Sequence, residues 1–166
     1  MKRIFLLILA CVFTIGAFAQ EADLSKLRAG VGLVYASEIE NVGLNLNGVY
    51  AFTDQWEGEF AFTHIFKKNY VSFNVIDLNA HYVFYQPDDK TNIYGLGGLA
   101  INFVKLEDFG LGLVPDKSYT DTQLGFNLGV GLNYKIAEQL NLAPQIQYTI
   151  MDGSYLRIGI SVQYLF

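Results

Sequence analysis

The sequence is poor in the side chains that most enzymes and metal centres require. It contains one cysteine, Cys11, and two histidines, His64 and His81. A structural zinc site takes four ligands of this kind, and one thiol cannot build a disulfide framework. No nucleophile elbow or comparable acid–base motif accompanies them. We therefore expect no metal, no cofactor and no catalytic centre.

Long apolar runs are also missing after the first twenty residues, although a membrane-spanning helix needs about twenty of them in succession. The N-terminus differs. Lys2 and Arg3 precede an apolar run and the triplet Ala17-Phe18-Ala19, which is the pattern of a secretory signal with its cleavage site. We expect residues 1–19 to be removed as a signal peptide and the mature chain to begin at Gln20.

An alternative interpretation makes Cys11 the lipidated first residue of a lipoprotein, because Ile8-Leu9-Ala10-Cys11 loosely resembles a lipobox. Against it, the apolar run continues past Cys11 to a better cleavage site. A chain that begins at Gln20 contains no cysteine, and therefore no thiol chemistry.

Positive charge is scarce as well. Without Lys2 and Arg3, nine basic residues face sixteen acidic ones, a net charge of −7. Nucleic-acid binding requires a basic surface, so we expect no nucleic-acid partner.

What the sequence does contain is a strict alternation of apolar with small or polar residues. From Leu124 to Tyr134 every second residue is Leu, Phe, Val or Tyr, and those between are Gly or Asn. A period of two indicates a β-strand whose two faces meet different surroundings. Two similar runs follow, and the last ends on Phe166. An oily face and a small or polar face, repeated in consecutive strands, predict a β-barrel with lipid outside and a polar interior.

The same period yields eight candidate strands. They cover residues 27–36, 42–52, 57–66, 71–85, 93–104, 122–136, 140–150 and 156–166. Eight antiparallel strands match the smallest membrane barrels, and closure is required because lipid cannot pair an open sheet edge. We predict an all-β, eight-stranded antiparallel up-and-down transmembrane barrel over residues 27–166, after a short periplasmic segment at 20–26.

Two positions suggest local irregularity. In the fifth strand, Tyr94 and Leu96 favour the opposite parity to Ile101 and Phe103, so a bulge at Gly97-Gly98 could switch it. Pro144 costs the seventh strand one ladder hydrogen bond.

Strand count, outward aromatics and the terminal Tyr164-Leu165-Phe166 resemble the small outer-membrane β-barrel family that includes OmpX and the transmembrane domain of OmpA. The resemblance implies the outer membrane of a Gram-negative bacterium and lipid surroundings. It also implies that Tyr164 and Phe166 form part of the signal read by the barrel-assembly machinery. The family includes adhesion proteins, anchors, narrow pores and a few lipid-modifying enzymes, so it does not select a function.

Several charged residues share the inward parity, where a narrow barrel is filled by side chains and buried charges must be paired. We expect Arg28, Glu57, Glu59 and Lys135 near the periplasmic end, with Asp77 and Arg157 nearer the middle or outer end. An ion-pair network that plugs the lumen is the favoured interpretation, and a constricted ion path is the alternative. The predicted network consists of Arg28, Glu57, Glu59, Asp77, Lys135 and Arg157.

The surface offers further candidates. His64 lies on the outward parity near the outer rim, which would suit a rim histidine or, alternatively, a lipid-modifying enzyme.

The 105–121 loop is the longest connection, and long loops are often functional. We expect its Phe109, Leu111, Asp116 and Tyr119 to meet an extracellular partner. Aromatic residues near strand ends are expected to anchor the barrel at the membrane interfaces: Tyr35, Tyr50, Phe52, Trp56, Tyr82, Phe84, Tyr134, Tyr148, Tyr155 and Tyr164.

Four functions stay open. The leading one is a non-enzymatic barrel with a structural or surface-interaction role. The others are a narrow pore for ions or small hydrophobic solutes, a lipid-modifying enzyme, and a soluble secreted barrel whose apolar face points inward to hold a ligand.

Overall fold

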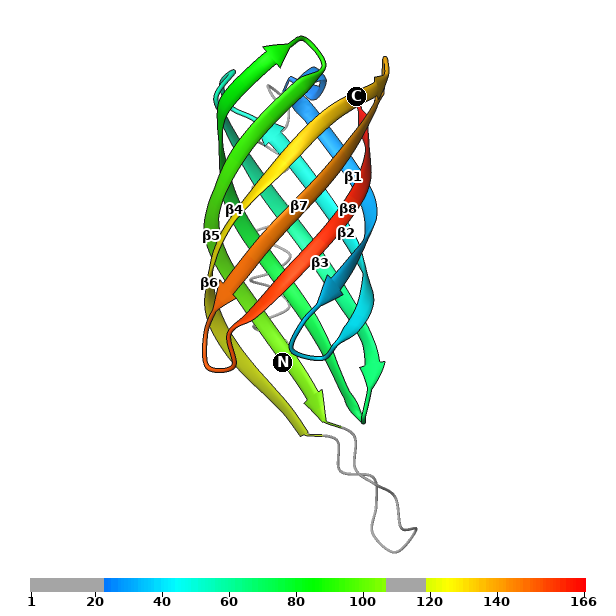
Figure 1. Ribbon diagram of the computed structural model, residues 1–166, viewed down its shortest axis with the longest axis vertical. Helices are drawn as coiled ribbons and strands as arrows, with labels where there is room; N and C mark the ends of the chain where they lie inside the picture. The colour runs from blue at the N-terminus through cyan, green and yellow to red at the C-terminus, as the bar shows by residue number, and fades with distance from the viewer. Residues whose placement is uncertain (1–22, 107–118) are drawn as a thin grey trace, which may run out of the picture.

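A computed structural model describes residues 23–106 and 119–166, and their strands form a closed barrel (Figure 1). Each strand pairs antiparallel with the next, and β8 closes on β1. This confirms the predicted eight-stranded antiparallel up-and-down barrel. The strands are β1 (Leu27–Ala36), β2 (Asn41–Ala51), β3 (Trp56–Lys68), β4 (Val71–Asp88), β5 (Thr91–Leu106), β6 (Tyr119–Ala137), β7 (Leu140–Ile150) and β8 (Tyr155–Leu165).

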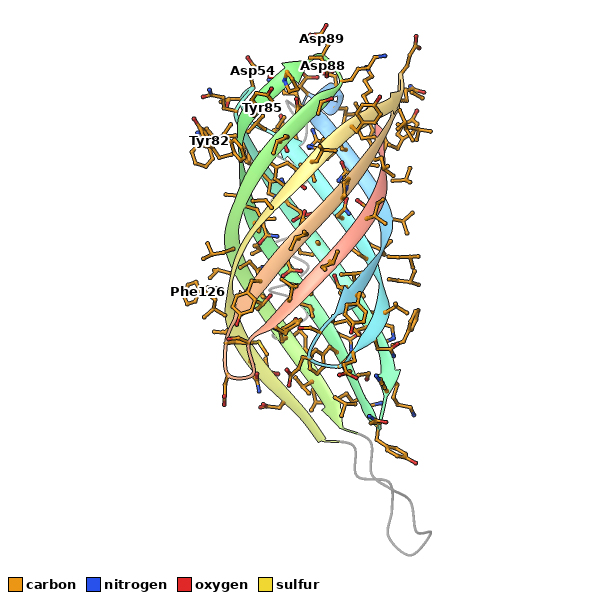
Figure 2. All side chains as sticks on the ribbon, viewed as in Figure 1. Asp54, Tyr82, Tyr85, Asp88, Asp89 and Phe126 are labelled. Carbon is orange, nitrogen blue, oxygen red and sulfur yellow. The ribbon has the colours of Figure 1, made fainter. Side chains whose placement is uncertain are left out.

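The apolar parity faces outward. Leu128 is 57% exposed and Ile160 46%, whereas Asn127 beside Leu128 is 1% exposed. Figure 2 shows large side chains projecting from the outside of the wall, with Phe126 and Tyr82 labelled among them. This orientation contradicts the soluble alternative, which needs the apolar side chains at the centre. Within the described residues, no helix is long and apolar enough to cross a membrane.

The suggested bulge at Gly97-Gly98 is wrong. β5 keeps one register across both glycines against β4 and β6, so Tyr94 and Leu96 share the inward face with Asn102 and are buried. Tyr94 fits inside because its partner on β6 is Gly131, where an added Cβ would collide with the tyrosine ring. Apolar side chains at inward positions therefore reflect space left by the neighbouring strand.

β7 is irregular near its start, as expected, but the register shift does not lie at Pro144. The β6–β7 register is the same at Gly131–Gln145 and Tyr134–Leu142, on either side of Pro144, and shifts between Lys135–Asn141 and Ala137–Leu140. β3 carries a further shift between Ile65 and Lys68 against β4.

The two ends of the barrel differ. At one end, called the terminal end, β1 begins and β8 finishes, and short turns join β2 to β3, β4 to β5 and β6 to β7 (Figure 1, top). A 3₁₀ turn, η2 (Leu24–Lys26), precedes β1 there and is capped by Asp23, whose side chain accepts a hydrogen bond from the Ser25 backbone N–H. The opposite end, called the loop end, holds the β1–β2, β3–β4 and β7–β8 connections.

Candidate functional site: the barrel lumen

A buried ion pair crosses the lumen from β8 to β4. Arg157 Nη1 lies 2.7 Å from Asp77 Oδ2, and Nη2 lies 2.7 Å from Oδ1. Both side chains are almost fully buried, at 4% and 2% exposure. Two parallel N–H···O bonds hold the planar guanidinium in one orientation, so this pair fixes β4 and β8 relative to each other across the barrel.

Amide and hydroxyl groups add hydrogen bonds to both members of this pair, whereas the buried Arg157 Nε has no hydrogen-bond partner among the described residues. Asn127 Nδ2 donates to Asp77 Oδ1 at 2.8 Å, and Gln147 Nε2 donates to the same oxygen at 3.4 Å. Arg157 Nη2 also donates to Thr149 Oγ1 at 3.0 Å. Buried charges are tolerated when they are both paired and hydrogen-bonded, which is the arrangement seen around Asp77.

A second ionic cluster lies toward the terminal end. Arg28 donates to both carboxylate oxygens of Glu57, at 2.9 and 2.7 Å. His81 lies between two carboxylates, with Nδ1 at 3.6 Å from Glu57 Oε2 and Nε2 at 3.3 Å from Glu59 Oε2. Its ring stacks on Tyr94, with the ring centroids 4.3 Å apart. The positions follow from the register, because Glu57 is paired with His81 across β3 and β4.

Asn79 joins the two clusters. Its Nδ2 donates to Glu59 Oε2 at 2.7 Å, and its Oδ1 accepts from Asn127 Nδ2 at 2.9 Å. A continuous chain of polar contacts therefore runs along the lumen from Arg28 to Arg157. Reasoning from charge alone overlooked the neutral members of this chain, although their inward parity was visible: Asn79, Asn127, Gln147 and Thr149.

Lys135 is the predicted network residue that the structure leaves apart. It lies on the inward parity of β6 and is half-buried, but its side chain forms no ion pair with a carboxylate in the described part of the chain. The pairing places Lys135 opposite Asn141, away from the acidic residues of β3. Arg28, Glu57, Glu59, Asp77 and Arg157 form the ionic contacts described above.

Buried apolar clusters lie inside the barrel toward both ends, which the sequence did not reveal. Toward the loop end, Tyr155 belongs to a buried cluster and is 1% exposed. Its hydroxyl donates to Asn102 Oδ1 at 2.6 Å. The prediction that Tyr155 anchors the barrel at a membrane interface is therefore wrong, because it shares the inward parity of Arg157. The clusters consist of Ala36, Ile39, Ile65, Phe73, Val75, Ala100 and Tyr155 at the loop end, and of Val83, Tyr94 and Leu96 toward the terminal end.

A cavity of about 50 Å³ lies within the lumen, and polar side chains including Asn47, Glu59, Arg157 and Gln163 line it. One water needs roughly 10–15 Å³ of such space, so the cavity has room for a few water molecules. Among the described residues, no three His, Cys, Asp or Glu side chains are placed to hold a metal ion.

The remaining predicted residues lie away from the lumen. His64 faces outward, with Nδ1 2.7 Å from Asn74 Oδ1, and this hydrogen bond supplies an amide in place of a nucleophile. Tyr164 and Phe166 face outward with their rings in edge contact. Phe109, Leu111 and Asp116 lie outside the described residues, as do residues 1–19, which were predicted to be a signal peptide, and Tyr119 is the first residue of β6.

Comparison with known proteins agrees with this architecture. The sequence matches the model of the outer membrane protein β-barrel domain family over residues 5–166. A search of curated proteins gives no significant match.

Among solved structures, the N-terminal β-barrel domain of Pseudomonas aeruginosa OprF is similar, with a TM-score of 0.68, 18% identity and coverage of 84% of this chain and 96% of that one. The attachment invasion locus protein Ail of Yersinia pestis has a TM-score of 0.59 and 19% identity, with coverage of 83% of this chain and 94% of that one. Neisserial surface protein A has a TM-score of 0.63 and 14% identity, with coverage of 84% of this chain and 96% of that one. At these identities the neighbours support the fold alone. The family match decides the assignment: this chain belongs to the outer membrane protein β-barrel domain family and lies in the lipid of the outer membrane.

Proposed function

We propose that this protein is a non-enzymatic barrel whose lumen is a packed plug and whose working surface is its loop end. The observation that carries the plug is the cross-lumen pair of Arg157 with Asp77, flanked by apolar clusters toward both ends. A conducting pore needs a continuous wet path. The apolar clusters interrupt such a path, so the narrow pore is the less favoured function.

Planar-bilayer recording tests the plug. The refolded mature chain is expected to insert, verified by its heat-dependent gel migration, and to give no stable channel openings. A double variant, Tyr94→Ala with Tyr155→Ala, removes one aromatic ring from each apolar cluster and is expected to open more often than wild type. Stable openings of the unaltered protein would refute the plug and favour the pore.

A surface-interaction role is supported by an unpaired strand edge. The β5–β6 pairing extends to Leu106–Tyr119, whereas the β6–β7 pairing ends at Phe126–Ile150. Residues 120–125 of β6 therefore have no β7 partner. An unpaired edge cannot lie in hydrocarbon, so this segment belongs above the bilayer, at the side where longer loops face outward. Such an edge is a template for strand addition by an extended peptide.

Peptide selection tests this role. A library of unstructured peptides is selected against the barrel in nanodiscs, and we expect enriched peptides with alternating β-branched residues. Their binding should be lost in Thr120→Lys with Thr122→Lys, because charged side chains block edge pairing. The matched control, Gln55→Lys with Gln139→Lys, adds the same charge at the terminal end. Equal binding to both variants would refute the edge as the binding surface.

A further inference from the structure

The paired charges inside the barrel leave one carboxylate without a cation. Glu57, Glu59 and Asp77 are buried acidic residues of the lumen. Arg28 forms an ion pair with Glu57, and Arg157 forms one with Asp77. Glu59 has no arginine or lysine partner among the described residues. A buried charge without a counter-charge is costly, so a further positive charge is expected beside Glu59.

His81 lies where that charge is needed, with one glutamate at each ring nitrogen. Its Nε2 lies 3.3 Å from Glu59 Oε2, and its Nδ1 lies 3.6 Å from Glu57 Oε2. An ionised carboxylate only accepts hydrogen bonds, and a neutral imidazole has a single N–H. A neutral ring would therefore direct a lone pair at one of the two carboxylates. The doubly protonated ring presents an N–H to each of them.

The face of the imidazole is also suited to a cation. Tyr94 of β5 stacks on His81, with the ring centroids 4.3 Å apart and the ring planes 15° apart. An aromatic face attracts a positive charge at this distance. The Tyr94 hydroxyl donates to Gln145 Oε1 at 2.9 Å, so it does not compete with His81 for the glutamates. Through Tyr94, the histidine also contacts the apolar cluster toward the terminal end.

The other basic groups near His81 do not replace it. Arg28 of β1 uses both of its terminal nitrogens on Glu57. Lys135 of β6 is half-buried and forms no ion pair within the part of the chain that the structure describes. Asn79, two residues before His81 on β4, gives Glu59 a neutral amide donor. The proton of His81 is therefore the charge that balances Glu59.

We propose that His81 binds a regulatory proton, and that its imidazolium holds Glu57 and Glu59 together and keeps the plug closed. Without that proton, Glu59 keeps only the amide of Asn79, and Tyr94 no longer faces a cation. The contacts favour the charged ring, so the lumen is closed at neutral pH and loosens as the pH rises. The effect on conductance rests on the proposed plug, whereas the charge of His81 does not.

Nitrogen NMR of the refolded barrel in nanodiscs, with isotope-labelled histidine, tests the charge. The signals of His81 are those missing from His81→Gln, which leaves His64 as the internal comparison. At neutral pH, we expect both ring nitrogens of His81 to carry hydrogen. A single protonated nitrogen would overturn the proposal, because the balancing proton would then lie elsewhere, such as on Glu59.

Urea unfolding in vesicles tests the charge balance independently. His81→Gln leaves Glu59 without a counter-charge, and the folding equilibrium constant should fall about ten- to a hundred-fold. Adding Glu59→Gln to this variant balances the charges again and should recover most of the loss. The matched control, His64→Gln, changes the histidine outside the lumen and should unfold like wild type. No recovery in the double variant would overturn the charge balance.

Planar-bilayer recording at neutral and alkaline pH tests the regulation. Wild type should open more often at alkaline pH, whereas His81→Gln with Glu59→Gln should behave alike at both. Openings of wild type that do not change with pH would overturn the regulatory role. If those openings are absent at both pH values, the plug itself stands, and stable openings already at neutral pH would refute the plug as well.

Discussion

The buried pair of Asp77 and Arg157 gives the sharpest energetic prediction. In Arg157→Gln the Asp77 carboxylate keeps only amide donors, from Asn127 and Gln147. In Asp77→Asn the guanidinium loses its counter-charge. Removing one partner of a buried ion pair costs about 3–5 kcal/mol, so each single variant should be destabilised by about that amount. The double variant should cost much less than the sum, because two neutral amides can hydrogen-bond in the same space. We expect a coupling free energy of at least about 2 kcal/mol.

Urea unfolding of the barrel in phospholipid vesicles measures these free energies. Trp56 is the sole tryptophan and packs on Tyr82, with the ring centroids 4.9 Å apart, so its emission reports unfolding. The exposed pair Lys68–Glu40 is the control, and Lys68→Gln with Glu40→Gln should show coupling under about 1 kcal/mol. Additivity at Asp77 and Arg157 within about 0.5 kcal/mol would refute the view that they act as one unit.

Three further predictions concern packing, a buried hydroxyl and assembly. Gly98→Ala should lose about 1–3 kcal/mol of unfolding free energy, because its Cβ would collide with the Leu78 carbonyl. Gly97→Ala is the control and should be nearly neutral, because its Cβ would meet no atom closer than 3.9 Å. Similar urea midpoints for the two variants would contradict the assigned faces. Tyr155→Phe should lose about 1–2 kcal/mol with its hydrogen bond to Asn102, and Tyr35→Phe, on the exposed face, should lose almost nothing in the same urea assay. Phe166→Ala should reduce the folded barrel in outer-membrane fractions on gels, if this outward terminal ring is read during assembly; full recovery of folded protein would remove it from that role.

The fold could be predicted from the sequence because the alternation that reveals each strand lies within that strand's own residues. Each strand of a membrane barrel alternates between lipid and lumen, so a single run such as Leu124 to Tyr134 shows both its structure and its orientation. Closure followed from the lipid surroundings, which cannot pair an open sheet edge. The same parity also placed Arg28, Glu57, Asp77 and Arg157 inside before any coordinates were known.

Partner choice in the lumen could not be predicted, because it depends on strand register. Arg157 meets Asp77 across 80 residues of sequence, and Arg28 on β1 reaches Glu57 on β3 past the intervening β2. Tyr94 was misread because an apolar residue normally marks the lipid face of a barrel. Its inward position follows from the space at Gly131, on the neighbouring strand.

The most direct test of the central claim is a map of which side chains touch acyl chains. NMR cross-relaxation between lipid methylene protons and the barrel in nanodiscs provides it. Contacts are expected at the methyl groups of Leu128, Ile146 and Ile160, with none at the side-chain amides of Asn127 and Gln147. Acyl-chain contacts at those amides, with no contacts at the three methyl-bearing residues, would contradict the orientation on which the plug depends.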